Sequence, residues 1–208
     1  MIYQEFADFW RQLPVRETVH PADKPILSAR RHSLRTELRP AFGAGPLATA
    51  RVVLCYLNNK FTEEDDKLGI DPIERMIDPP EDWGEYLAGI IEGRRDPLPF
   101  RPWGEVRIRD LDGIKVATFN IVPYRSREFR ERSLARRLPS AQMARSYLHN
   151  VLLPEAAGSE RFVVIVWGAK LWGVEPEDSH DTLAVCTRNR KGYLPDDVKR
   201  RIKAWANI

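Results

Sequence analysis

The chain of 208 residues contains only two cysteines and four histidines, and no long uninterrupted apolar run. Two thiols cannot by themselves ligate an iron–sulfur cluster or a structural zinc, and the histidines lack metal-ligand spacing, so we expect no metal and no cofactor. No segment approaches the ~20 apolar residues of a membrane span, and we expect no membrane association. Cys55 and Cys186 lie in apolar, strand-like runs, which predicts buried, reduced thiols in a cytoplasmic protein.

Positive charge is unevenly distributed along the chain. The net charge is only +3, too small to indicate a polyanionic partner on its own. Basic residues concentrate in "RSREFRERSLARR" (125–137), "RNRK" (188–191) and "KRRIK" (199–203). A solvated helix face accounts for any one of these segments. Three of them in the C-terminal half, two directly after strand-like runs, favour a surface that binds phosphates.

Apolar runs and helical patterns alternate after a Pro-, Arg- and Gly-rich beginning. The runs at 50–57, 114–122, 161–168 and 181–187 predict strands, and the amphipathic N-terminus predicts a docked helix rather than a signal peptide. Thr62, Ser140 and Asp196 are expected N-caps of the intervening helices. The length predicts a single domain over 1–208, on which residues 1–48 pack as a helical and irregular extension.

This alternation predicts an α/β fold, a three-layer α/β/α sandwich around a mostly parallel four-stranded sheet. In such sheets, ligands bind beyond the carboxyl ends of the strands. The polar segments "LNNKF", "FNIVPYRS", "WGAKLW" and "TRNRKGYL" occupy those ends. The first could be no more than a turn, because Asn tolerates left-handed backbone angles.

Taken in order, the four strand ends resemble the uracil-DNA glycosylase superfamily over roughly residues 45 to 205. "YLNNKF" resembles the first motif of the mismatch-specific branch, G-[IL]-N-P-G-[FY]. "KVATFNIVPYRSRE" resembles the strand whose Asn reads the flipped base, "FVVIVWGAKLW" the strand with the recurring "WG", and "RNRKGYL" the last motif, N-P-S-G-L or H-P-S-P-L. Each motif alone is weak, but their order and spacing agree.

The resemblance implies a role for each matching residue. Asn58 would position the attacking water, Asn120 would bind the edge of the flipped base, and Asn189 would face the sugar and the leaving base. Further expected members of the base pocket are Asn59, Phe61 and Tyr124, although Phe61 and Tyr124 could equally serve packing. The expected DNA-binding residues are Lys60, Arg125, Arg127, Arg190, Lys191, Gly192 and Tyr193, the last as a wedge that fills the vacated stack.

The chain departs from the family pattern at two points. Asn59 and Lys60 replace Pro-Gly, and Arg190 and Lys191 replace Pro-Ser. These changes favour a modified or unusual base over uracil. An amide cannot take a proton as a carboxylate does. Asp65 or Asp66 could therefore assist catalysis, although helix capping and solvation account for both.

The expected function is a monofunctional, monomeric DNA glycosylase that flips a base out of DNA and leaves an abasic site. Some bacterial members of the superfamily act on phage DNA with hypermodified pyrimidines, so a defence role is a further expectation beside DNA repair. Two alternatives remain: a catalytically silent DNA-binding module of the same fold, and an α/β enzyme that acts on a free nucleoside or nucleotide.

Overall fold

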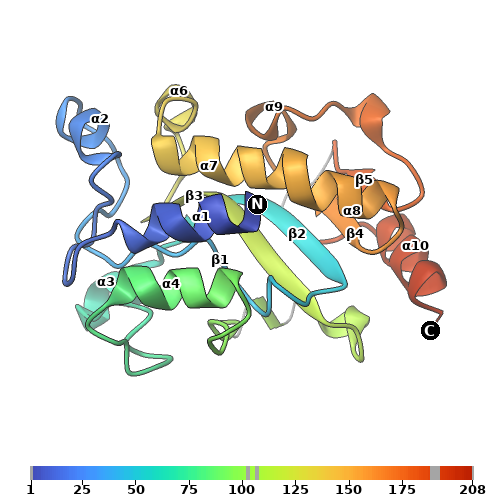
Figure 1. The fold of residues 1–208 in the computed structure, drawn as a ribbon, viewed down its shortest axis with the longest axis horizontal. Coiled ribbons are helices and arrows are strands. Elements are labelled where there is room, and N and C mark those ends of the chain that lie inside the picture. The colour runs from blue at the N-terminus through green and yellow to red at the C-terminus, as the bar shows by residue number, and fades with distance from the viewer. Residues whose placement is uncertain (1, 102–103, 106–107, 188–192, 208) are drawn as a thin grey trace.

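A five-stranded mixed sheet forms the centre of the molecule (Figure 1). The computed structural model describes residues 2–101, 104–105, 108–187 and 193–207. The strand order is β1-β3-β2-β4-β5. The strands are β1 Gly43–Ala44, β2 Val52–Lys60, β3 Val116–Ser126, β4 Phe162–Ile165 and β5 Leu183–Val185. Strands β2 to β5 are mutually parallel, whereas β1 pairs antiparallel with β3.

The predicted α/β class and the mostly parallel sheet are confirmed, but the predicted number of four strands is wrong. The additional strand is β1, which is two residues long and lies within the Gly- and Pro-rich approach to β2. A strand this short has no alternation of apolar residues, so periodicity could not reveal it.

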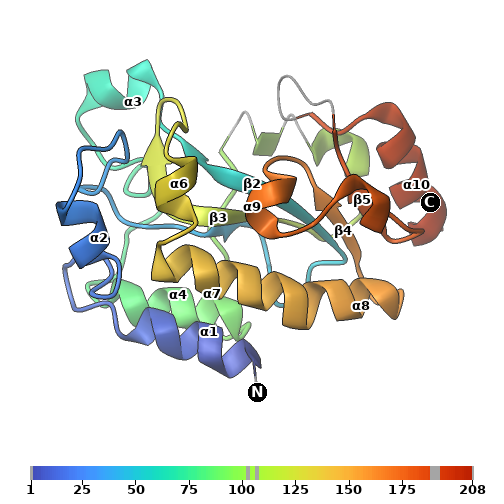
Figure 2. The same ribbon diagram turned by 90° about the horizontal axis from the view of Figure 1, so that it is seen from above.

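Helices cover both faces of the sheet (Figure 2). The larger apolar core includes residues of α1, α4 and α7, and the smaller core on the other face includes residues of α10. The helices are α1 Ile2–Arg11, α2 Lys24–Ser28, α3 Glu63–Leu68, α4 Trp83–Ile91, α6 Arg132–Ala135, α7 Pro139–Tyr147, α8 Leu153–Ala157, α9 Ala169–Trp172 and α10 Asp196–Ala206. Shorter turns are η1 Arg109–Leu111, the π-helical η2 Leu148–Leu152 and η3 Pro176–Asp178. No described helix has the length and apolar character needed to cross a membrane.

Two of the three expected N-caps differ in the structure. Thr62 caps α3 as predicted and forms a capping box with Asp65. Helix α7 begins at Pro139, and the Ser140 amide donates to Asp23 Oδ1 at 3.0 Å, so its cap comes from a distant segment. Asp196 is the first residue of α10 rather than its cap.

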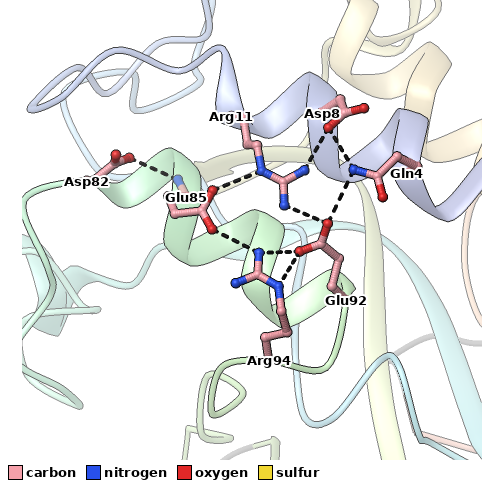
Figure 3. Close-up of polar contacts among 7 residues, drawn as sticks. All are labelled: Gln4, Asp8, Arg11, Asp82, Glu85, Glu92 and Arg94. Carbon is pink, nitrogen blue, oxygen red and sulfur yellow. Dashed lines mark hydrogen bonds and ion pairs between the residues drawn. The ribbon is translucent and has the colours of Figure 1, made fainter.

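Helices α1 and α4 are joined at the surface by a polar network (Figure 3). Arg11 on α1 pairs with Asp8 of its own helix and with Glu85 and Glu92 at α4. Arg94 bridges the same two glutamates. Since one guanidinium pairs with three carboxylates, the ordering cost of the network is shared among several contacts.

The order of the parallel strands fixes where a ligand crevice is expected. Strand β2 lies between β3 and β4, so the chain leaves β2 to one side and later returns to the other. In open α/β sheets, the crevice lies beyond the carboxyl ends at such a reversal, here between β2 and β4.

The register between β2 and β3 shifts near the end of β2. Asn58 pairs with Val122 and Lys60 with Ser126, so an advance of two residues along β2 matches an advance of four along β3. Bulges of this kind redirect side chains next to functional sites.

Candidate functional site

A pocket of about 520 Å³ lies at this reversal, and we call it the strand-end pocket. Its lining comes from the end of β2, the turn after β3, and the turn after β4. The lining residues include Asn58, Lys60, Ser126, Arg127, Arg132 and Trp167. A second pocket of about 380 Å³ shares Leu57, Arg132, Trp167 and Gly168 with it and extends toward the end of β5. The two pockets are therefore neighbours at the carboxyl edge of the sheet.

Asn58 lies in the strand-end pocket with its amide group fixed. Its Nδ2 donates to Tyr124 O at 3.1 Å and to Ser126 Oγ at 2.8 Å. Both hydrogens of the amide nitrogen are thereby used, and no donor in the described part of the chain reaches Oδ1. The positive-φ residues of the described chain do not include Asn58, which lies in extended β2 rather than in a turn. Asn58 therefore presents a fixed carbonyl acceptor to the pocket.

Asn120 lies deeper, within β3 rather than at its end. It is buried and pairs with Tyr56, while Asn58 pairs with Val122, and it is not among the described residues that line the strand-end pocket. The two asparagines are two residue pairs apart, roughly 7 Å along the strands. Asn120 Nδ2 is enclosed and has no hydrogen-bond partner among the described residues. A buried donor without a partner is rare in folded proteins.

Asn59 and Phe61 are not brought into the strand-end pocket. Asn59 Nδ2 donates to Ala41 O at 2.8 Å, and its side chain lines a different cavity, next to β1. Phe61 is buried beneath Arg35, whose guanidinium carbon lies 4.3 Å from the ring centroid. Adjacent residues of a strand point to opposite faces, which accounts for the separation of Asn58 from Asn59.

Tyr124 and Arg125 are also buried, because β3 continues to Ser126. The Tyr124 hydroxyl donates to Asp23 Oδ2 at 2.7 Å, and burial next to this carboxylate raises the pKa of Tyr124. Tyr124 contributes to the site only through its carbonyl, which holds Asn58. Arg125 lines the same cavity as Asn59 and does not reach the strand-end pocket.

Exposed cations surround the two pockets. Lys60 and Arg127 line the strand-end pocket, and Arg132 lines both pockets. Arg136 and Lys170 line the second pocket. Arg127 pairs with Asp66, whereas Arg132 and Arg136 form no ion pair within the described ranges. The sequence signal for the last two was the basic run 125–137, in which they stand four residues apart on one helical face.

The acidic residues after β2 serve other contacts. Asp65 accepts from Arg101 Nη2 at 2.6 Å and Nη1 at 3.0 Å and caps α3 through Thr62. Burial acts to raise the pKa of Asp65, but the hydrogen bonds from Arg101 and Thr62 outweigh it, and the pKa is lowered overall. Hydrogen bonding from Arg35 lowers the pKa of Asp66. Neither carboxylate lines the strand-end pocket, whose acidic lining residue is Glu128.

Trp167 and Gly168 form the turn after β4 and were seen in the sequence only as a "WG" dipeptide. The Trp167 ring meets Tyr56 edge-on, with centroids 6.0 Å apart. Gly168 has a φ of 79° and starts α9 against Leu57. Ser126, which holds Asn58, was missed because its role depends on the register between β2 and β3.

The two cysteines and the histidines do not form a reactive or metal-binding group in the described chain. Cys55 and Cys186 are both free thiols, and burial raises the pKa of Cys186 to about 11, which keeps it protonated at neutral pH. No cluster of three or more His, Cys, Asp or Glu side chains suited to a metal ion occurs among the described residues.

The loop after β5 carries the remaining expected site residues. Asn189, Arg190, Lys191 and Gly192 lie outside the described residues. Tyr193 is described, and 47% of its surface is exposed. Comparisons of the chain with protein-family models, with curated proteins and with solved structures find no match.

Proposed function

We propose that the chain is a monofunctional DNA glycosylase that accepts a flipped nucleotide in the strand-end pocket and hydrolyses its N-glycosidic bond. The observation that carries this proposal is Asn58: its Nδ2 is fixed by Tyr124 O and Ser126 Oγ, and its Oδ1 remains available in a pocket of about 520 Å³. A carbonyl oxygen held in this way can accept a hydrogen bond from a water and orient it.

The proposed reaction transfers the sugar from the base to water. The water oxygen bonds to C1′ of the sugar as the bond from C1′ to the base nitrogen breaks, and the base leaves with the electron pair. The surplus proton of the water passes to the base or to solvent, because an amide does not accept it. The products are a free base and an abasic site.

Asn120 supplies the second element of the proposal. Negative charge develops on the departing base, and a preorganised donor directed at that charge stabilises the transition state. We assign this role to the enclosed Nδ2 of Asn120, which has no hydrogen-bond partner among the described residues. Asn120 lies two residue pairs before Asn58 along the sheet. The fold expected of the uracil-DNA glycosylase superfamily is part of the same proposal, supported by the parallel strands β2 to β5 and helices on both faces.

The substrate we propose is a base with an added polar group, such as a hypermodified pyrimidine, rather than uracil. Exposed Lys60 lines the pocket where the resembling motif has glycine, and Arg132 lines it from α6. Both cations favour a substituent that carries hydrogen-bond acceptors or negative charge. Base excision from phage DNA, in defence, is the biological setting that this substrate class suggests.

The test is incubation of the purified chain with duplex and single-stranded DNAs that carry uracil or phage-type modified bases. Released base is measured by mass spectrometry, and abasic sites by alkaline cleavage. We expect release of a modified base, and a loss of activity of ~100-fold in Asn58→Ala, because misplacing a reacting group costs about that much. Ser126→Ala keeps the bond to Tyr124 O and should lose less, while Asn150→Ala, an exposed asparagine on η2, should match the wild type.

Two other results would replace the proposal. If no DNA loses a base, and Asn58→Ala binds DNA like the wild type, the chain is a silent DNA-binding module. If the chain converts free nucleosides or nucleotides, and its binding changes little with salt, it is a nucleotide enzyme, because one phosphate releases far fewer counterions than a duplex.

A further inference from the structure

Arg125 is a buried cation without a counterion. The residue is only 3% exposed, and its Nε is enclosed without a hydrogen-bond partner. Within the described part of the chain its guanidinium forms no hydrogen bond and no ion pair. Burial lowers the pKa of Arg125 to about 10, so the group is still charged at neutral pH. An isolated charge in a protein interior is strongly unfavourable unless an opposite charge accompanies it.

The nearest acidic groups already have other partners. Asp65 and Asp71 both act on Arg125 electrostatically, and Arg101 opposes them. The Asp65 carboxylate is held by Arg101 and Thr62. Asp71 accepts from the backbone N–H groups of Arg39 and Ile73 at 2.8 and 2.9 Å. Neither carboxylate is free to turn toward Arg125.

A cavity of about 40 Å³ adjoins the Arg125 side chain on the β1 side of β3. Its polar lining comes from Arg101, Asn59 and Thr118, and its apolar wall includes Leu98 and Phe100. Since one water needs about 10–15 Å³ measured this way, the cavity holds about three waters or one small ion. It is too small for a nucleobase, and none of the described residues that line it is a carboxylate.

We propose that this cavity binds a small monovalent anion, chloride or an ion of similar size, as the counterion of Arg125. Arg125 provides the unpaired charge, and Arg101, whose guanidinium is paired with Asp65, lines the cavity beside it. Arg125 stands between Tyr124 and Ser126, the two residues that hold Asn58, so the anion fixes β3 directly behind the strand-end pocket. The proposal does not depend on glycosylase activity.

The test measures the NMR line width of chloride in the presence of the full chain. Exchange with a site on the slowly tumbling protein broadens the signal, and we expect excess broadening that bromide or nitrate removes at constant ionic strength. Gluconate, which is too large for the cavity, should not remove it. The melting temperature of the wild type should likewise be higher in chloride than in gluconate, because a ligand that binds only the folded state stabilises it.

The matched variants are Arg125→Met and Arg200→Met. Arg125→Met keeps much of the side-chain volume without the charge, and the excess broadening should be lost. Arg200→Met removes an exposed cation from α10, away from the cavity, and should leave the broadening unchanged. Undiminished broadening in folded Arg125→Met would overturn the proposal. If that variant does not fold, the competition experiment on the wild type is the test. A chloride line width that bromide does not reduce would also contradict the proposal.

Discussion

Gly168 holds the turn after β4 in a backbone conformation that is unfavourable for other residues. Its φ is 79°, and a Cβ added there would collide with the side chain of Leu57. Leu57 precedes Asn58 and lines both pockets. Gly168 therefore allows β4 and α9 to approach the end of β2 closely enough to close the site from this side.

We predict that Gly168→Ala lowers the free energy of unfolding by more than the backbone cost alone. Positive φ costs a non-glycine residue about 1–2 kcal/mol. The collision with Leu57 adds to this. Gly113→Ala is the matched control, because Gly113 has a φ of 84° with open space around it. Urea unfolding of both variants separates the backbone cost from the cost of the collision. Equal losses of unfolding free energy in the two variants would mean that the Leu57 side chain moves aside at no energetic cost.

The sequence was sufficient to predict where Asn58 lies, at the pocket beyond the end of β2, but not where Asn59, Tyr124 and Arg125 lie. A polar residue at the end of a central strand meets the crevice in any open parallel sheet, so Asn58 needed only local information. Tyr124 and Arg125 looked equally suited, but they are buried because residues of the N-terminal segment pair with this part of β3. Arg35 N donates to Arg125 O and Ala41 N to Pro123 O. Contacts this distant in sequence leave no local pattern.

The start of helix α3 was predicted correctly from the sequence. Its capping box uses Thr62 and Asp65, which are three residues apart, and local spacing reveals such pairs. The start of α7 was misplaced because its cap, Asp23, lies 117 residues away. The same side chain accepts from Tyr124, so one buried aspartate fixes both α7 and β3.

We predict that Asp65→Asn destabilises the protein at neutral pH by about 2 kcal/mol, since it weakens a charge-assisted hydrogen-bond pair with Arg101. The pKa of Asp65 is lowered in the folded state, so its stabilisation is complete above the unfolded pKa of about 3.9. That stabilisation is lost as the pH falls through the still lower folded value.

The measurement is urea unfolding of wild type and Asp65→Asn at pH 7 and pH 3. The difference in unfolding free energy should be largest at pH 7 and should narrow at pH 3. If the difference in unfolding free energy were the same at pH 7 and pH 3, the charge of Asp65 would contribute nothing to stability.

The exposed cations of the two pockets lie on the edge of the sheet where the pockets open. Arg132 and Arg136 approach from α6, and Lys170 from α9. Short helices carry these side chains, because α6 and α9 follow directly after the turns that end β3 and β4 (Figure 2). The arrangement suits a long polyanion that crosses the carboxyl edge.

We predict that the double variant Arg132→Ser/Arg136→Ser binds DNA with a shallower salt dependence than the wild type. Each phosphate contact contributes about −0.9 to the slope of log affinity against log salt, so two lost contacts flatten it by up to ~1.8. Fluorescence anisotropy over a salt series measures this slope. Arg200→Ser/Lys203→Ser removes two exposed cations from α10 and should leave it unchanged. If both double variants reduced the salt dependence equally, DNA binding would depend on the net charge of the protein and not on a defined DNA-binding surface.

The order of the five strands also bears on how the protein avoids self-association. An uncovered edge strand is a template on which another chain can add a strand. The eleven-residue β3 would offer such an edge, but β1 and the bridge from Arg35 to Arg125 occupy its outer side. The opposite edge is β5, which has only three residues. The irregular segment before β2 thus also shields the longest strand from aggregation.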